Sequence, residues 1–200
     1  MEIKKIVSRG IDENCYLLIN GRDAILIDPG DDALKILSEC EGYNVKYILL
    51  THCHFDHTYS LSELKGQKTV LGSFNIMSNI IDQKITYLPS RKKMDGIIDG
   101  YFKDGEEKNL CGIKVKCIYT PGHTDCSCCY LIEDCLFSGD TLFYGSIGRW
   151  DLKTGDFNEL ENSVRNKIYK FPDATKVYPG HGNTTTIGYE KKNGYFKEEK

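Results

Sequence analysis

Long apolar runs are absent from this 200-residue chain, which has no stretch near the ~20 residues that a membrane-spanning helix needs. Its first five residues, Met1-Glu2-Ile3-Lys4-Lys5, lack the apolar segment of a secretory signal. Neither sign of charge dominates, since 26 lysines and arginines stand against 29 aspartates and glutamates, a net charge of −3. A strongly basic surface for nucleic acid is therefore not expected. We expect a cytoplasmic protein with neither a membrane nor a nucleic-acid partner, and the oligomeric state stays open.

Cysteine, by contrast, is abundant, and its number of nine is odd. A disulfide framework favours an even number in a short secreted chain, so we expect free thiols in a reducing compartment. One Cys-x-x-Cys pair, Cys126 with Cys129, has no second pair to complete a four-thiolate zinc or iron–sulfur site. We interpret this cluster as small apolar residues of a buried strand.

Length and composition, with 40% hydrophobic residues, predict one domain over residues 1–200. Early strands are expected over 14–19 and 24–28, joined at Asn20-Gly21, which is a strong hairpin signal. A helix with Leu34, Leu37 and Cys40 at helical spacing should then end at Gly42, before a strand over 45–50.

Later strands are predicted over 113–119, 128–132, 135–137 and 175–178. Helices are predicted around Leu61 and Leu64, ending at Gly66, and from the capping box Asp156–Glu159 through Ile168. Residues 72–108 show no clear pattern, and we expect a substrate-covering loop there. This order predicts sheets with helices packed outside them.

Histidine is scarce, and the position of each one is informative. The five histidines lie at positions 52, 54, 57, 123 and 181. Each lies at or just after the end of a predicted strand, and Asp140 ends another. A single histidine in a turn is usually a polar loop residue, but all five share this placement. Because loops at strand ends gather functional groups on a rigid scaffold, we interpret them as one site.

The spacing predicts two metal ions. His52 and His54 are two residues apart in an extended segment, so they point to the same side and can bind one cation. Asp56 and His57 turn into a helix and can serve a second. Seven donors exceed what one tetrahedral ion accepts. The predicted sets, which share Asp140, are His52, His54 and His123 for one ion and Asp56, His57 and His181 for the other. Both sets leave room for water, as catalytic sites do.

In these residues the chain resembles the metallo-β-lactamase-fold hydrolase superfamily. The motifs, in the family's order, are Asp28-Pro-Gly30, Thr51-His-Cys-His-Phe-Asp-His57, Thr120-Pro-Gly-His-Thr124, Ser138-Gly-Asp-Thr-Leu-Phe143 and Tyr178-Pro-Gly-His-Gly182. The His-x-His-x-Asp-His run is highly specific for the superfamily but not for a substrate. The resemblance implies an α+β fold, a four-layer αββα sandwich with the metals at one edge of the two sheets.

Within the superfamily, Gly145-Ser-Ile-Gly-Arg-Trp-Asp151 is similar to the glyoxalase II-like (hydroxyacylglutathione hydrolase-like) branch. Asp140 stands where true β-lactamases carry a metal-binding cysteine, which argues against lactam hydrolysis as the main role. Two features depart from the branch. The chain stops soon after Tyr195-Phe196, without the helical domain with which longer glyoxalase II enzymes hold glutathione, and Gly194 replaces a common proline.

The hypothesis is hydrolysis of a small thioester, S-lactoylglutathione or a related acyl-thiol. Two divalent ions, zinc by expectation with iron or manganese as alternatives, would lower the pKa of a bridging water from about 15.7 to roughly 7. The resulting hydroxide would attack the carbonyl carbon, with Asp140 fixing the metal spacing and Asp56 orienting the hydroxide. Tyr144 and Arg149 follow Asp140 and could line the substrate pocket or be structural loop residues.

Other functions stay open at this point. An iron-dependent persulfide dioxygenase would need one metal and oxygen, and a lactonase or other ester hydrolase of the same fold would use the same site. A nuclease would need a nucleic-acid surface that the charge does not indicate. A metal-binding protein without catalysis is disfavoured because all seven donor positions are intact.

Overall fold

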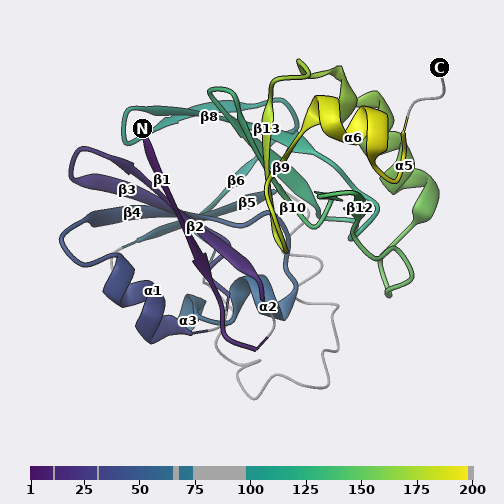
Figure 1. The fold of residues 1–200 in the computed structure, drawn as a ribbon. Coiled ribbons are helices and arrows are strands. Elements are labelled where there is room, and N and C mark those ends of the chain that lie inside the picture. Colours follow the sequence, from purple (N-terminus) through teal and green to yellow (C-terminus); the bar gives the residue numbers. More distant parts are fainter. Residues whose placement is uncertain (11, 31, 65–67, 74–97, 198–200) are drawn as a thin grey trace.

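Two six-stranded sheets pack face to face, with helices on their outer sides (Figure 1). The computed structural model describes residues 1–10, 12–30, 32–64, 68–73 and 98–197. None of the helices in these ranges combines the length and the apolar character that a membrane span requires.

The first sheet is built from strands in chain order. They are β1 (Glu2–Val7), β2 (Asn14–Asn20), β3 (Asp23–Ile27), β4 (Asn44–Leu49), β5 (Thr69–Ser73) and β6 (Gly100–Phe102). The first three run antiparallel, and β3 to β6 run parallel. Asn20 pairs with Asp23 across a two-residue turn in which Gly21 has φ of 66°. The hairpin predicted at Asn20-Gly21 is therefore confirmed.

The second sheet reverses its order and contains one parallel pair. Its order is β14 (Thr185–Thr186), β13 (Lys176–Pro179), β10 (Cys135–Gly139), β9 (Cys128–Ile132), β8 (Ile113–Tyr119) and β7 (Glu107–Leu110). Among its described strands, only β10 and β13 pair in parallel. A separate small ribbon joins β11 (Leu142–Phe143) to β12 (Ser146–Ile147).

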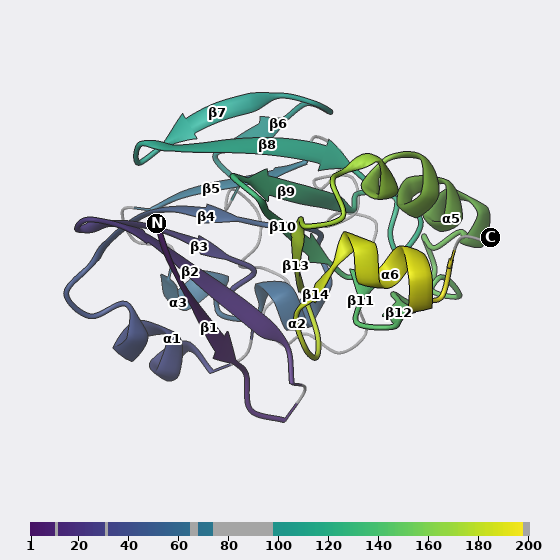
Figure 2. The ribbon, with the colours of Figure 1, turned by 45° about the horizontal axis from the view of Figure 1, so that its top comes forward.

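Helices cover the outside of each sheet, as Figure 2 shows from a second direction. Those beside the first sheet are α1 (Ala33–Glu39), α2 (Phe55–Thr58) and α3 (Leu61–Leu64). Those beside the second are α5 (Phe157–Asn166), the 3-10 turn η2 (Ile168–Lys170) and α6 (Ile187–Asn193).

Alternating side chains of β2 show how the layers form. Leu17 and Ile19 pack with Ile36 of α1 in an outer cluster, whereas Tyr16 and Leu18 enter the cluster between the sheets. Successive strand residues point to opposite faces, so a strand that is apolar on both faces must be covered on both. A third cluster joins the second sheet to α5 and α6. The predicted four-layer αββα fold is confirmed.

Two details of the predicted helices were wrong. Ile36 is the buried residue of α1, while Leu34 is 81% exposed and Leu37 is 43% exposed. The buried face of this helix therefore centres on Ile36 and not on the row Leu34, Leu37 and Cys40. α5 ends at Asn166, and Ile168 belongs to η2, although it is still buried.

Seven strands and one helix were not predicted, namely β1, β5, β6, β7, β11, β12, β14 and α6. Of these strands, β1, β6, β7 and β14 lie at sheet edges, and β6, β11, β12 and β14 have only two or three residues, too few to show an apolar pattern. Of the segment 72–108, residues 74–97 lie outside the described residues, so the predicted covering loop stays untested, as does the helix end at Gly66. The remainder contains β6, β7 and the end of β5.

Candidate metal centre

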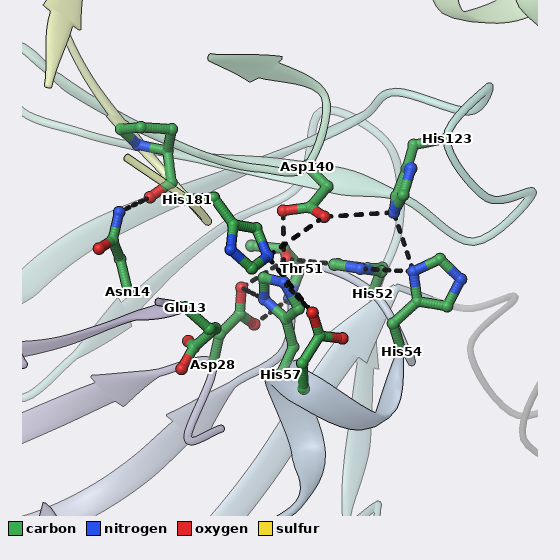
Figure 3. Close-up of polar contacts among 12 residues, drawn as sticks. Glu13, Asn14, Asp28, Thr51, His52, His54, His57, His123, Asp140 and His181 are labelled. Carbon is green, nitrogen blue, oxygen red and sulfur yellow. Dashed lines mark hydrogen bonds and ion pairs between the residues drawn. The ribbon is translucent and has the colours of Figure 1, made fainter. Parts of the chain in front are cut away.

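The side chains of the predicted site converge where loops from both sheets meet (Figure 3). In the first sheet, β4 leads into the segment that carries His52 and His54 and then into α2. In the second sheet, His123 follows β8, and Asp140 and His181 follow β10 and β13. Since β10 and β13 are parallel neighbours, their carboxyl ends meet at one edge. His52, His54, His123, Asp140 and His181 therefore follow the ends of strands, whereas Asp56 and His57 lie in the helix α2 that comes next after β4.

Three imidazoles form the first donor group. His54 Nδ1 lies 3.1 Å from His52 Nε2 and 2.9 Å from His123 Nε2. Nitrogens around a tetrahedral zinc at about 2.0–2.1 Å would lie about 3.3 Å apart, so the three nitrogens are close to the spacing that one ion requires. In two of the three rings, the other ring nitrogen also has a partner. His52 Nδ1 contacts Thr51 Oγ1 at 3.0 Å, and His123 Nδ1 donates to the Arg149 carbonyl at 2.6 Å.

A carboxylate and two imidazoles form the second donor group. Asp56 Oδ2 lies 3.3 Å from His181 Nε2 and 3.9 Å from His57 Nε2. These three residues come together as one possible metal-binding cluster, separate from the three-imidazole group. Asp56 and His57 belong to α2, whereas His181 belongs to the opposite sheet, so this group bridges the sandwich.

Asp140 lies between the two groups. Its Oδ1 is 3.3 Å from His57 Nε2, and its Oδ2 is 3.4 Å from His123 Nε2 and 3.7 Å from His181 Nε2. One carboxylate thus faces donors of both groups, which is the arrangement predicted for a shared ligand.

Two buried atoms at this point have no hydrogen-bond partner, namely His57 Nε2 and Asp140 Oδ1. Buried polar groups are normally satisfied, and unsatisfied ones call for an unseen ion or water. Neutral imidazole and carboxylate are ordinary ligands for zinc, iron and other divalent metals. The residues present therefore fit a pair of divalent ions.

The family model of the metallo-beta-lactamase superfamily matches residues 9–71 and 95–181, which include all seven donors. The chain belongs to the metallo-β-lactamase superfamily. Among curated relatives, it is 32% identical to the hydroxyacylglutathione hydrolase GloC of Haemophilus influenzae, with 100% of both chains covered. It is also 32% identical to a probable metallo-hydrolase of Streptococcus pyogenes, over 96% of this chain and 88% of that one.

Two solved structures are similar to this chain over nearly its whole length. The B3 metallo-β-lactamase BLEG-1 is 32% identical, with a TM-score of 0.86 over 99% of this chain and 100% of that one. The protein TTHA1623, in a di-iron-bound form, is 28% identical, with a TM-score of 0.81 over 96% of this chain and 99% of that one. Divalent metal ions are thus expected in this superfamily member, and their identity is left to experiment.

Asp28 also contacts the residues of this site, and this role was not predicted from the sequence. Its Oδ2 accepts from Thr51 Oγ1 at 2.6 Å and contacts His57 Nδ1 at 3.0 Å, while its Oδ1 accepts from the Thr51 backbone at 2.8 Å. Asp28, His52 and His57 could by their spacing hold an ion. Because the oxygens of Asp28 are already used, we assign it to orienting His57. Its place in Asp28-Pro-Gly30, at the end of a strand, was the available signal.

The two donor groups differ in their electrostatics. Burial lowers the pKa of His52 and His123, and burial together with nearby His123 lowers that of His54 to about 4. Burial also disfavours the charged form of His57, but the carboxylates of Asp140 and Asp28 outweigh it and raise the pKa of His57 well above its usual value. The first group is therefore neutral at neutral pH, whereas the second must lose a proton from His57 to bind a metal.

Tyr144 and Arg149, the predicted substrate-binding residues, make contacts of two different kinds. The Arg149 side chain is exposed and pairs with Asp151 at 2.9 Å, but its carbonyl accepts from His123, so Arg149 contributes to the site through its backbone. Tyr144 is 50% exposed and stacks on Tyr189 at 4.8 Å between ring centroids. Neither contact tests substrate binding, which stays a prediction for both.

Proposed function

We propose that this protein is a two-metal hydrolase that cleaves a small thioester, such as S-lactoylglutathione or a related acyl-thiol. The observation that carries the two-metal part is the position of Asp140, whose carboxylate faces both donor groups at 3.3–3.7 Å. The thioester is favoured by the likeness to GloC across 100% of both chains.

The chemistry of a thioester suits the residues available. Two divalent ions held here would supply Lewis acidity and an acidified water near neutral pH. Asp56 is only partly buried and its Oδ2 lies 3.3 Å from His181 Nε2, so its carboxylate is available to accept a proton from the attacking water. A departing thiolate needs no strong proton donor, and all five histidines are used as donors to the two groups. We propose zinc as the metal, with iron or manganese as alternatives.

We also propose a class of binding partner and a cellular location. The substrate is a small molecule, with no nucleic-acid or membrane partner, and the protein is cytoplasmic. All nine cysteines lie in the described residues and none of them forms a disulfide, which supports a reducing compartment.

The test combines metal content with turnover. We expect two ions per chain and cleavage of S-lactoylglutathione that a chelator abolishes. Asp140→Ala should lose at least 100-fold in turnover while keeping the far-UV circular dichroism of the fold. Asp173→Ala, which removes an exposed carboxylate paired with Lys191, is the matched control and should keep turnover. Retained turnover in Asp140→Ala would refute the shared-carboxylate mechanism.

A second candidate is β-lactam hydrolysis, favoured by the 32% identity to the B3 metallo-β-lactamase BLEG-1. A chromogenic cephalosporin in the same assay separates the two. Cleavage of the cephalosporin without cleavage of any thioester would replace the first proposal. One iron per chain and oxygen consumption with a persulfide would instead indicate a dioxygenase.

A further inference from the structure

The loop that carries His181 is held by hydrogen bonds from the opposite sheet. Asn14, the first residue of β2, donates from Nδ2 to the Pro179 carbonyl at 2.9 Å and to the Gly182 carbonyl at 3.0 Å. These two carbonyls lie on either side of His181 along the chain. A single side chain of the first sheet is therefore bonded to the loop of the second sheet on both sides of His181. Figure 3 shows Asn14 beside this loop.

Further bonds from the same strand reinforce this contact. The Asn14 backbone donates to the Gly180 carbonyl at 2.7 Å, and Tyr16 Oη donates to the Pro179 carbonyl at 2.7 Å. Asn14 and Tyr16 are 1% and 2% exposed, so these bonds are shielded from water. The Tyr16 ring is itself fixed, with its centroid 5.3 Å from Phe137 in an edge-to-face contact.

The position of the loop that carries His181 affects the second donor group in particular. His181 Nε2 faces Asp56 Oδ2 at 3.3 Å, yet the two residues come from different sheets. The distance between them depends on how the loop sits on β2. The first group, by contrast, is held by Thr51 and by the Arg149 carbonyl, and neither contact involves β2.

We propose that Asn14 and Tyr16 are positioning residues for the second metal ion: they set His181 against Asp56 across the sandwich and so determine the affinity of that ion. This rests on the two-metal site of the proposed function. Neither residue contacts the metal-binding atoms, so both act through the backbone of the loop. Losing them leaves the three-imidazole group in place.

Removing the donors while keeping the skeleton of the side chain separates positioning from packing. Asn14→Leu keeps the same branched arrangement of heavy atoms and removes both bonds donated by the side chain, and Tyr16→Phe removes only the hydroxyl. Asn20→Leu is the matched control, because Asn20 ends the same strand and also donates to the other sheet, at the Cys111 carbonyl 2.9 Å away. That contact is far from the metal centre. His181→Ala provides the reference for loss of the second ion.

The measurement is titration of metal-free protein with Zn²⁺ against a competing chelator, which resolves two dissociation constants. In Asn14→Leu and Tyr16→Phe we expect the weaker, second constant to rise at least tenfold. The first constant should change by less than threefold, which also shows that the protein is folded. Asn20→Leu should match the wild type in both constants.

Equal changes in both constants, or none in the second, would overturn the proposal, as would binding of a single Zn²⁺ by the wild type. If Asn14→Leu does not fold, Tyr16→Phe decides by the same criteria. No substrate is used, so failure of the thioester proposal is seen separately: a protein that binds two ions and cleaves no thioester would leave this inference intact.

Discussion

Two histidine rings of the site are oriented by hydrogen-bond partners on the ring nitrogen that does not face the other donors. His57 presents Nε2 to the metal centre because Asp28 holds Nδ1 at 3.0 Å, and His123 presents Nε2 because the Arg149 carbonyl holds its Nδ1. Such partners fix the tautomer and the orientation of a metal-binding ring. Asp28 is buried and both of its carboxylate oxygens already accept hydrogen bonds, so we assign it only this orienting role.

Asp28→Asn should therefore weaken metal binding without unfolding the protein. An amide cannot accept on both sides as the carboxylate does, so His57 loses its charged partner. We expect roughly a 10–100-fold loss in affinity for the second ion and in turnover. Zinc titration and thioester hydrolysis measure both. Asp23→Asn, at an exposed pair with Lys46, is the control. Wild-type values in Asp28→Asn would show that His57 is held by packing alone.

At the scale of elements, the loops after β10 and β13 pack so closely that one position excludes a side chain. The Gly180 backbone donates to the Gly139 carbonyl at 2.8 Å, which draws the two loops together. A Cβ added at Gly180 would collide with Asp140 Oδ1 and lie 2.6 Å from His57 Cε1. The close approach of these loops is thus a condition for placing Asp140 between the donor groups.

Gly180→Ala should accordingly displace Asp140 and abolish binding of at least one Zn²⁺ ion per chain. Gly21→Ala is the control: an added Cβ there meets nothing within 4 Å, but φ is 66°. It should cost about 1–2 kcal/mol of stability through its left-handed backbone and leave metal binding unchanged. Metal stoichiometry and urea unfolding distinguish the two effects. Two bound Zn²⁺ ions per chain in Gly180→Ala would contradict this prediction, because they would show that the two loops can move apart without loss of metal binding.

At the scale of the whole molecule, the metal centre is a cluster of buried ionisable groups between two sheets, and it couples folding to pH. His52, His54 and His123 have lowered pKa values, that of His54 being about 4. Between about pH 6.5 and pH 4 the unfolded chain binds protons that the folded metal-free protein does not. His57 and His181 act in the opposite direction, because their folded pKa values are raised and the folded protein already holds protons that the unfolded chain takes up only as the pH falls through about 6.5.

Because three histidines with lowered pKa values stand against two with raised ones, metal-free protein should lose a net ~1–2 kcal/mol of stability between pH 7 and pH 5. Burial raises the pKa of Glu13, which stabilises the fold as the pH falls and so opposes the effect. Urea unfolding with a chelator present, in the Glu13→Gln background, measures the histidine contribution. A stability that rises on acidification in that variant would contradict the assignment of neutral rings to the first group.

From local patterns alone, the sequence predicted the candidate donors and half of the described strands, and its resemblance to the superfamily predicted the four layers. His52-x-His54 needs only an extended backbone to aim two rings together, and β2 needs only two apolar faces to require cover on both. Tertiary structure decided the rest. The bond from Asn14 to the Pro179 carbonyl joins residues 165 positions apart, and the support of His57 by Asp28 spans 29. No local pattern encodes such contacts, since they exist only once the two sheets have packed and brought their loop ends to one edge.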